Sequence, residues 1–492
     1  MRVLDRTSPG FLYQQVIDFI EQQEKSGAIL PGDKLPSLRK LSKQFEISVP
    51  TVKQAYLELE RQGKISAKPQ SGYYLKAKQV RNLLPMRAKW AGSSPVEVSC
   101  RTLIQQVYDA LHRPDTVELG ISNPVHAHPP DKTLARLMRS VLSRVAEKAV
   151  SYGPSAGCPK LRLTLACRYQ EHGVAVDHDD IVITSGAQEA LSIALQCVAK
   201  RGDVIAVESP VYFGLVELIE SLGMKALEVY TCTEDGVCLT DLEHMLDQHN
   251  VTACLFSTAI NNPLGSMMTD AQRQQMVKLL ESRDIPLIED EVYSDLYFTD
   301  KRPIPAQLYS EKGLVMTCSS FSKTAAPGYR VGWLIPGKFS LEAKRLKRAL
   351  SCSTPMLQQW TLTDYILSGD YDRYIAVLRK QLRYNCERMR ALIAEHFPPE
   401  VCISTPQGGS VLWIRCRSHV DTGKFFHQAI ELGVSFAPGE IFSPSGKYKN
   451  FMRISFGVQW SEQVEHAVAV LGKLVRDYPL PEMPKELTEI CC

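Results

Sequence analysis

The N-terminal residues alternate between short apolar helical faces and turn-forming segments. Three such faces follow one another, and in each the apolar residues recur at intervals of three and four, as a helix packed on one side requires. They are Leu12, Val16, Phe19 and Ile20, then Leu38, Leu41 and Phe45, then Val52, Ala55, Tyr56 and Leu59. Gly27 and Gly63 end the first and third helices. Residues 64–75, with Pro69 and Gly72, then predict a two-stranded hairpin.

Helix, helix-turn-helix and hairpin is the plan of a winged helix-turn-helix. Ser37 is a good N-cap for the second helix, and Pro50 stands near the start of the third, where its missing N–H costs nothing. Because the third helix of such a module enters the major groove by its N-terminal end, we expect DNA contacts there and on the wing. The candidates are Arg39, Ser48, Thr51, Lys53, Lys68, Gln70 and Ser71. A small protein-docking module is the alternative interpretation.

The larger C-terminal part alternates short apolar runs with helical segments. The runs are 181–183, 204–207, 253–256, 286–288 and 314–316. Strands buried on both faces and separated by helices predict a mostly parallel α/β sheet. Ligands of such sheets bind beyond the carboxyl ends of the strands, and polar residues follow these runs in the sequence.

Length and composition favour several soluble domains. With 492 residues, 44% hydrophobic and 23% charged, the chain is too long for one compact core. We expect a DNA-binding domain at 1–78, a linker at 79–114 without sustained periodicity, an α/β body at 115–475 and a tail at 476–492. No apolar run approaches a membrane span and no signal peptide is apparent, which indicates a cytoplasmic protein without membrane contact.

Charge and cysteine content refine this interpretation. Residues 1–78 carry thirteen Lys and Arg against eight Asp and Glu, whereas the whole chain has a net charge of only +3. A basic head on a near-neutral body favours nucleic-acid contact. The 14 cysteines are scattered, without the paired spacing of a zinc site, so we expect no metal.

The run 320–333 contains the clearest candidate for a reactive site. Lys323 is flanked by Ser322 and Thr324, and Arg330 follows seven positions later. A lysine amine forms a Schiff base with the aldehyde of pyridoxal phosphate, and hydroxyls with a guanidinium suit its phosphate. Asp290, at the end of another apolar run, is placed to pair with the pyridine nitrogen. The sequence therefore predicts a pyridoxal phosphate site.

The N-terminal segment resembles the GntR family of bacterial regulators over nearly all of residues 10–76. The residues that carry the resemblance are Pro31–Arg39, Thr51–Val52, Ala55–Tyr56, Leu59, Gly63 and Ser71–Gly72. This family often has an arginine just before the recognition helix, where this chain has Val49 and Pro50. The base preference of the family is therefore not carried over.

Residues 115–475 resemble the fold-type I aminotransferases, in particular the kynurenine and 2-aminoadipate branch. The resemblance rests on Tyr152–Gly157, Leu161–Arg162, Gly186–Gln188, Asn262–Gly265, Asp290–Tyr293 and the Lys323 run. It implies a large, mostly parallel-sheet domain and a smaller α+β domain. Asn261 and Leu264 depart from the common pattern without removing a cofactor contact.

The same resemblance implies a role for each matching residue. Lys323 and Asp290 would be catalytic, Asn262 and Tyr293 would hold the ring oxygen, and Tyr212 would stack on the ring. The phosphate would be bound by Gly186, Ala187, Gln188, Ser320, Ser322 and Arg330. Arg453 would hold a substrate carboxylate, and Tyr152 would come from the neighbouring subunit of a homodimer.

A GntR head on an aminotransferase-like body resembles the MocR-type regulators. This resemblance implies a dimeric transcription factor that binds double-stranded DNA and senses pyridoxal phosphate, an amino acid or an amine. A working aminotransferase with an accessory DNA-binding module is the alternative, since Lys323, Asp290 and Arg453 are all present. A third interpretation is a scaffold with a vestigial site.

Overall fold

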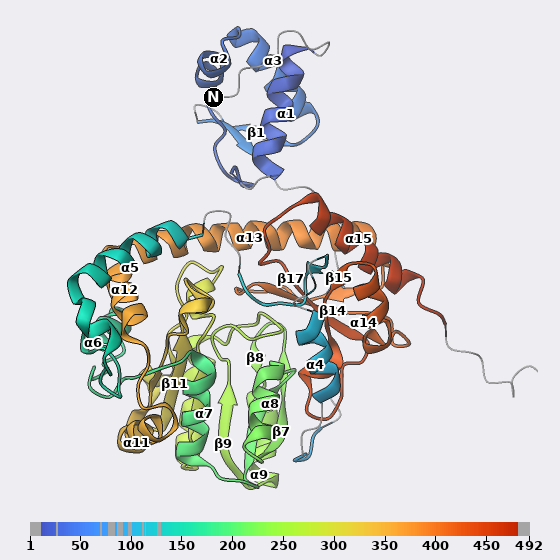
Figure 1. Ribbon diagram of the computed structural model, residues 1–492. Coiled ribbons are helices and arrows are strands. Elements are labelled where there is room, and N and C mark those ends of the chain that lie inside the picture. The colour runs from blue at the N-terminus through green and yellow to red at the C-terminus, as the bar shows by residue number, and fades with distance from the viewer. Residues whose placement is uncertain are drawn as a thin grey trace, which may run out of the picture.

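The computed structural model describes residues 11–25, 28–68, 71–76, 84–85, 92–96, 101–110, 113, 115–124 and 129–480. A small N-terminal head lies above a larger α/β body, and the long helix α13 (Asp370–His396) runs along the top of that body beneath the head (Figure 1). The Tyr384 hydroxyl on α13 donates to the Glu24 carbonyl of the head at 3.1 Å. In the part of the chain that the structure describes, no helix is long and apolar enough to cross a membrane.

The head is a winged helix-turn-helix, as its apolar pattern predicts. Helices α1 (Leu12–Lys25), α2 (Leu38–Phe45) and α3 (Val49–Arg61) precede an antiparallel hairpin of β1 (Ile65–Lys68) and β2 (Gly72–Leu75). The apolar residues of the three helices and of both strands form one buried cluster. The Ser37 side chain caps α2 by accepting from the Lys40 amide, and Ser48 caps α3 by accepting from the Thr51 amide.

The large domain of the body is built on an eight-stranded sheet of order β5-β12-β11-β10-β9-β6-β7-β8. Its strands are β5 (Val182–Thr184), β6 (Val204–Ser209), β7 (Lys225–Cys232), β8 (Gly236–Val237), β9 (Val251–Phe256), β10 (Leu287–Asp290), β11 (Val315–Ser320) and β12 (Gly332–Ile335). Only β12 and β8 pair antiparallel with their neighbours. The prediction of a mostly parallel sheet is confirmed.

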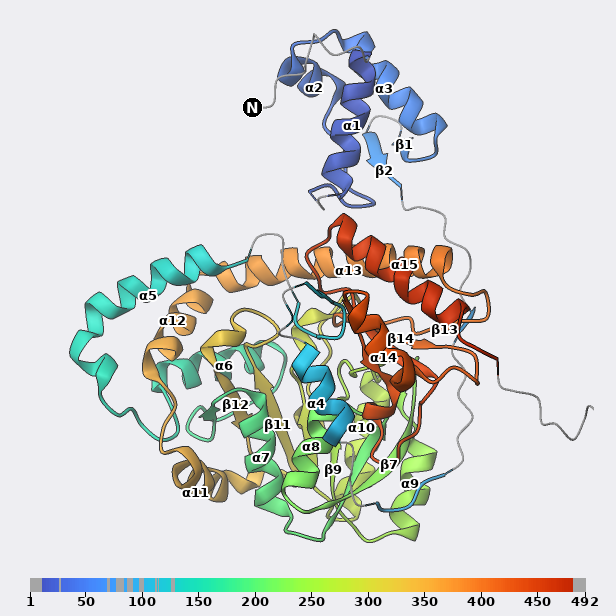
Figure 2. The ribbon, with the colours of Figure 1, turned by 45° about the vertical axis from the view of Figure 1, so that its right-hand side comes forward.

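Helices cover both faces of this sheet. Alternate residues of each strand point to opposite faces, so neighbouring residues of one strand pack against different helices. Ile205 and Val207 of β6 pack with α7 (Ala187–Val198), α8 (Phe213–Ser221) and α11 (Ser340–Ser351). Ala206, between them, packs with α9 (Leu239–Gln248) and α10 (Asp270–Ser282). Helices α5 (Asp131–Val145), α6 (Pro159–Glu171) and α12 (Met356–Leu367) lie together at one end of the body (Figure 2).

The smaller domain has a five-stranded sheet of order β16-β17-β14-β13-β3. Its strands are β16 (Ala437–Pro438), β17 (Phe451–Ser455), β14 (Val411–Arg415), β13 (Cys402–Ile403) and β3 (Leu84–Pro85), with α13, α14 (Thr422–Glu431) and α15 (Glu462–Arg476). The short strands β4 (Val117–Glu118) and β15 (Val434–Ser435) pair separately. Short 3-10 turns are Ala146–Val150, Ser294–Leu296, Ala306–Tyr309, Pro327–Tyr329, Gly337–Phe339 and Gly439–Phe442.

The segment between head and body touches both sheets. Residues of β3 pair in parallel with β13 of the small sheet. Val96 forms a bridge with Ala226 on β7 of the large sheet. Helix α4 (Arg101–Ala110) then packs on the body through the buried Ile104, Val107 and Ala110.

Candidate cofactor site and DNA-binding surface

The candidate cofactor site lies at the carboxyl edge of the large sheet. Parallel strands end at the same edge, so residues that follow different strands meet there. Gly186 comes after β5, Tyr212 after β6, Asn262 after β9, Asp290 ends β10 and Ser320 ends β11. Arg453 arrives from β17 of the small domain and completes the group.

Lys323 lies half-buried in the turn between β11 and β12. Its Nζ donates to the Ser122 carbonyl at 2.6 Å. Burial, together with the positive charges of Arg453 and Arg330, lowers the pKa of this amine to about 8, and the nearby Asp290 carboxylate opposes the shift. Near neutral pH a larger fraction of this amine is uncharged than in an exposed lysine, and only the uncharged amine is a nucleophile.

Asp290 stands at the end of β10 on the same edge. One carboxylate oxygen accepts from the Val292 amide at 3.1 Å. Burial raises the pKa of this carboxyl to about 6, while the Val292 amide and the charge of Lys323 lower it. A cationic partner in the site would stabilise the ionised form, which is the form that pairs with a protonated pyridine nitrogen.

In the cradle formed by the phosphate-binding candidates, the Arg330 guanidinium lies where a side chain on Gly186 would stand. A Cβ on this glycine would lie 2.4 Å from Nη2 of Arg330, and its φ is +85°. Arg330 donates to the Ser185 carbonyl at 3.0 Å and to the Ser322 hydroxyl at 3.3 Å. Ala187 and Gln188 begin α7, and the first amides of a helix have no partner within it.

Two hydroxyls complete the cradle. The Ser320 hydroxyl accepts from the Ser322 amide at 3.3 Å, which holds both serines beside Arg330. The Gln188 side chain faces elsewhere, since its amide donates to the Gly214 carbonyl at 2.9 Å. A guanidinium, helix-end amides and hydroxyls close together are the donor set that a phosphate takes.

Arg453 is fully buried beside this group. Its Nη1 donates to the Asn262 side-chain oxygen at 3.0 Å, and its Nη2 donates to the Gly120 carbonyl. Its guanidinium lies 5.0 Å from the ring centre of Phe442, and its Nε has no partner among the described residues. Burial lowers the pKa of this guanidinium. An unshared donor on a buried cation suits an anionic ligand group, such as a carboxylate.

Two tyrosines frame the space between Lys323 and Arg453. The Tyr293 hydroxyl bonds to the Ser122 hydroxyl and donates to the Ser122 carbonyl at 3.3 Å. The Tyr212 ring lies against Gly214, where a Cβ would come within 2.6 Å of the ring. Both phenol pKa values are raised by burial, so the hydroxyls stay protonated.

Tyr152 stands apart from the other candidates. Its side chain is 93% exposed, and the neighbouring Gly153 packs against Met356. Within one chain the structure therefore does not bring Tyr152 to the site.

Residues that were not among the predicted site residues also border the site. Ser122 bonds to Lys323, to Tyr293 and to the Ser410 hydroxyl at 3.2 Å. Tyr108 of α4 bonds to the Tyr212 hydroxyl. These contacts join segments up to 288 positions apart, and no local pattern indicates them.

The DNA-binding candidates lie around the start of α3 and on the wing. Arg39, Ser48 and Lys53 are exposed and Thr51 is half-buried. The Ser48 and Thr51 hydroxyls are 2.8 Å apart. Lys68 lies over the Tyr74 ring at 4.4 Å, and Ser71 bonds to the Tyr74 hydroxyl at 2.5 Å. Gln70 lies outside the described residues.

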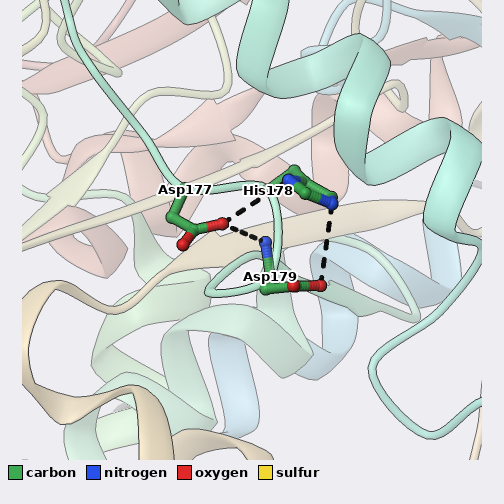
Figure 3. Close-up of side chains that lie close together, drawn as sticks. All are labelled: Asp177, His178 and Asp179. Carbon is green, nitrogen blue, oxygen red and sulfur yellow. Dashed lines mark hydrogen bonds and ion pairs between the residues drawn. The ribbon is translucent and has the colours of Figure 1, made fainter.

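A separate cluster joins Asp177, His178 and Asp179 in the turn before β5 (Figure 3). The Asp179 amide donates to the Asp177 carboxylate at 2.8 Å, and Arg162 pairs with the Asp179 carboxylate at 3.0 Å. The three residues are consecutive, and the bond within the turn together with the Arg162 ion pair accounts for the proximity of their side chains. The cluster therefore supplies no argument for a metal.

Comparison with known proteins matches both parts of the chain. Residues 12–75 match the family of bacterial regulatory proteins, gntR family, and residues 114–471 match aminotransferase class I and II. Two Escherichia coli (strain K12) proteins named as uncharacterized HTH-type transcriptional regulators are similar over most of their length. YdcR is 36% identical over 94% of this chain and 99% of its own, and YjiR is 34% identical over 94% and 98%.

A solved structure of kynurenine aminotransferase from Pyrococcus horikoshii shares the fold of the body. Its TM-score is 0.71 with 23% identity, and the match covers 78% of this chain and 96% of that one. The expected fold-type I body is thereby confirmed. The fold of this family is that of pyridoxal phosphate-dependent enzymes.

Proposed function

The chain belongs to the gntR family of bacterial regulators, in the MocR-type branch with an aminotransferase class I and II body, and we propose that it is a transcriptional regulator that senses a cofactor-bound amino acid or amine. The head binds double-stranded DNA. The body binds pyridoxal phosphate at Lys323 and admits the effector beside it. Occupancy of the body then changes the affinity or geometry of the head on DNA, which requires two states with different affinity for the effector.

The cofactor role of the body rests on the set of residues around Lys323. Pyridoxal phosphate, when bound, supplies an aldehyde that condenses with amines and a ring that withdraws electrons. Lys323 offers the amine, and Asp290 faces the pyridine nitrogen. Asn262, Tyr293 and Tyr212 border the ring. Gly186, Ala187, Gln188, Ser320, Ser322 and Arg330 hold the phosphate. The cradle at Gly186, which a methyl group would fill, supports this assignment.

The effector role rests on Arg453. This buried guanidinium binds the α-carboxylate of an amino acid, since its Nε has no partner among the described residues and aromatic rings pack around it. The functional unit is a homodimer in which Tyr152 reaches the neighbouring site. Its nearly complete exposure within one chain supports this proposal.

The head reads DNA through the start of α3, with Arg39, Ser48, Thr51 and Lys53 in the major groove or on phosphates. The wing residues Lys68, Gln70 and Ser71 reach the minor groove. The capped start of α3, with its exposed polar side chains, supports this orientation.

One observation carries the proposal: the complete Lys323, Asp290 and Arg453 set is fused to a helix-turn-helix head. Genome-wide footprinting of the purified protein, with and without pyridoxal phosphate, tests it. The proposal predicts discrete protected sites that the cofactor alters and that Arg39→Ala abolishes. Diffuse, salt-sensitive binding that the cofactor leaves unchanged would contradict it.

An active aminotransferase is the second candidate, and the same complete set of residues favours it. An amino acid offered together with a keto acid distinguishes the two functions. Repeated formation of the new keto acid would assign an enzyme. A single round of conversion that then stops fits a sensor.

A further inference from the structure

Helix α4 stands at the junction between the candidate site and the segment that leads to the head. Its first residue follows Val96 by five positions, and Val96 is bridged to β7 of the large domain. Three residues of α4, Ile104, Val107 and Ala110, are buried in the body. Val96 and α4 are thus two neighbouring points at which this part of the chain is held on the body.

The helix also lies between the two domains of the body (Figure 2). On the small-domain side, Leu103 approaches Gly423 of α14, where a Cβ would lie 3.6 Å from the leucine side chain. On the large-domain side, the Tyr108 ring meets Phe213 of α8 edge-on, with ring centres 5.7 Å apart. The position of α4 thus depends on both domains.

Tyr108 is the residue of α4 that reaches the site. Its hydroxyl is hydrogen-bonded to the Tyr212 hydroxyl and interacts with the Glu217 carboxylate of α8. The ring of Phe213, against which Tyr108 packs, lies 5.7 Å from the Arg453 guanidinium. One phenol therefore contacts the proposed ring-stacking residue and lies within electrostatic range of the proposed carboxylate-binding residue.

Tyr108 also keeps contact with solvent, since 36% of its surface is exposed. It stands at the boundary between the buried Arg453 and the outside of the body. An amino acid that pairs with Arg453 would lie close to both tyrosines, because the Phe213 ring packs against Tyr108 and Tyr212 and lies 5.7 Å from the Arg453 guanidinium.

We propose that Tyr108 is a positioning residue that couples occupancy of the amino-acid site to the connecting segment through α4. This inference rests on the proposed function. The Tyr108–Tyr212 bond holds α4 in one position when no amino acid is bound. Binding of an amino acid beside Arg453 weakens that bond and shifts α4, which changes how the connecting segment is held on the body next to Val96.

Tyr108→Phe is the most direct test, because it removes the hydroxyl and keeps the ring that packs on Phe213. Gln105→Ala is the matched control: Gln105 is exposed on the same helix, and among the described residues its side chain bonds to Asp109, one turn later. Three quantities are measured for the full-length protein: the absorbance change on adding pyridoxal phosphate, the thermal midpoint, and the DNA affinity with and without a mixture of the twenty amino acids.

Wild-type protein and Gln105→Ala are expected to show the same amino-acid-induced change in DNA affinity. In Tyr108→Phe the amino-acid-induced change in DNA affinity is expected to be roughly three- to ten-fold smaller, because one hydrogen bond contributes a free energy of about that size. Cofactor binding and the thermal midpoint are expected to stay unchanged. A structural role alone would lower the midpoint instead. Glu217→Gln, which keeps the Tyr108–Tyr212 bond, is expected to respond like wild type.

Three results would overturn the inference. If wild type responds and Tyr108→Phe responds equally, the coupling does not pass through Tyr108 and the proposed function stands. If Tyr108→Phe loses cofactor binding, Tyr108 belongs to the cofactor site itself. A wild-type protein whose DNA affinity ignores both cofactor and amino acids would remove the proposed function together with the inference.

Discussion

The guanidinium of Arg330 occupies the space that a side chain at Gly186 would need. The distance from its Nη2 to the position of a Cβ on Gly186 is 2.4 Å. Arg330 itself adopts a left-handed backbone conformation with φ of 52°. Such a conformation in a non-glycine residue is uncommon, and here it turns the guanidinium toward Ser185 and Ser322. The glycine and the arginine thus define the phosphate cradle together.

Gly186→Ala is expected to weaken pyridoxal phosphate binding by at least about ten-fold, because the displaced guanidinium loses charge-assisted hydrogen bonds. The cofactor dissociation constant, measured by absorbance titration, checks this. Gly202→Ala is the control: Gly202 has nearly the same φ, +89°, but nothing lies within 4 Å of its Cβ position. Equal loss in both variants would assign the effect to backbone strain instead of Arg330.

The reactivity of Lys323 is expected to depend on pH with a midpoint near its lowered pKa of about 8. The deprotonated amine condenses with the cofactor, so the rate of cofactor capture rises with pH and levels off above the midpoint. Removing a positive neighbour in Arg453→Gln is expected to move the midpoint upward, toward an ordinary lysine. Stopped-flow absorbance over pH 6–10 measures the rate of cofactor capture for wild type and for Arg453→Gln. Equal midpoints in the two proteins would show that the charge of Arg453 does not lower the pKa of Lys323.

The buried pair Lys347–Glu189 is expected to be important for the stability of the body. Lys347 is fully buried, and its Nζ lies 2.9 Å from a Glu189 carboxylate oxygen that also accepts from the Ser185 amide. Lys347→Ala leaves this carboxylate without its cation, which costs roughly 3–5 kcal/mol in the free energy of unfolding. Denaturant titration checks the value.

The exposed pair Arg345–Glu342, on the same helix α11, is the control for that experiment. Arg345→Ala is expected to leave the unfolding transition in place, because solvent screens exposed ion pairs. Since Glu189 also holds Ser185 of the cradle, Lys347→Ala is expected to weaken cofactor binding as well. A variant with native stability and native cofactor affinity would show that the pair supports neither.

Lys53 at the start of α3 is expected to contact a DNA phosphate. Lys53→Ala would then weaken binding to all sequences alike and reduce the slope of log affinity against log salt by about 1. Arg61, at the other end of α3 and paired with Glu58, is the control, and Arg61→Ala should leave the slope unchanged. Affinities measured at four salt concentrations give both slopes. If the two variants behave alike, α3 does not approach DNA by its N-terminal end.

Much of the fold follows from local patterns. The apolar faces of the head coincide with α1, α2 and α3, and Ser37 caps its helix as predicted. The expected strands at 204–207 and 253–256 lie within β6 and β9. These elements were accessible because period and capping are properties of neighbouring residues.

The residues of the site that were not predicted reach it through contacts between parts of the chain that are far apart in the sequence. Ser122 meets Lys323 across 201 positions, and Tyr108 meets Tyr212 from a helix that precedes the body sheet. Neither residue has a local pattern that distinguishes it from an ordinary surface residue. The antiparallel β12 was likewise not predicted, because a short apolar strand does not show its direction in the sequence.

The most direct test of the account compares wild type with Lys323→Ala on the strongest DNA site found by footprinting. DNA affinity is titrated at fixed salt without additions, with pyridoxal phosphate, and with pyridoxal phosphate plus amino acids. We expect the wild-type affinity to change by about five-fold or more, or its protected pattern to change. Lys323→Ala is expected to bind the same site without responding to the additions. Identical behaviour of the two proteins, whether both respond or neither does, would contradict it.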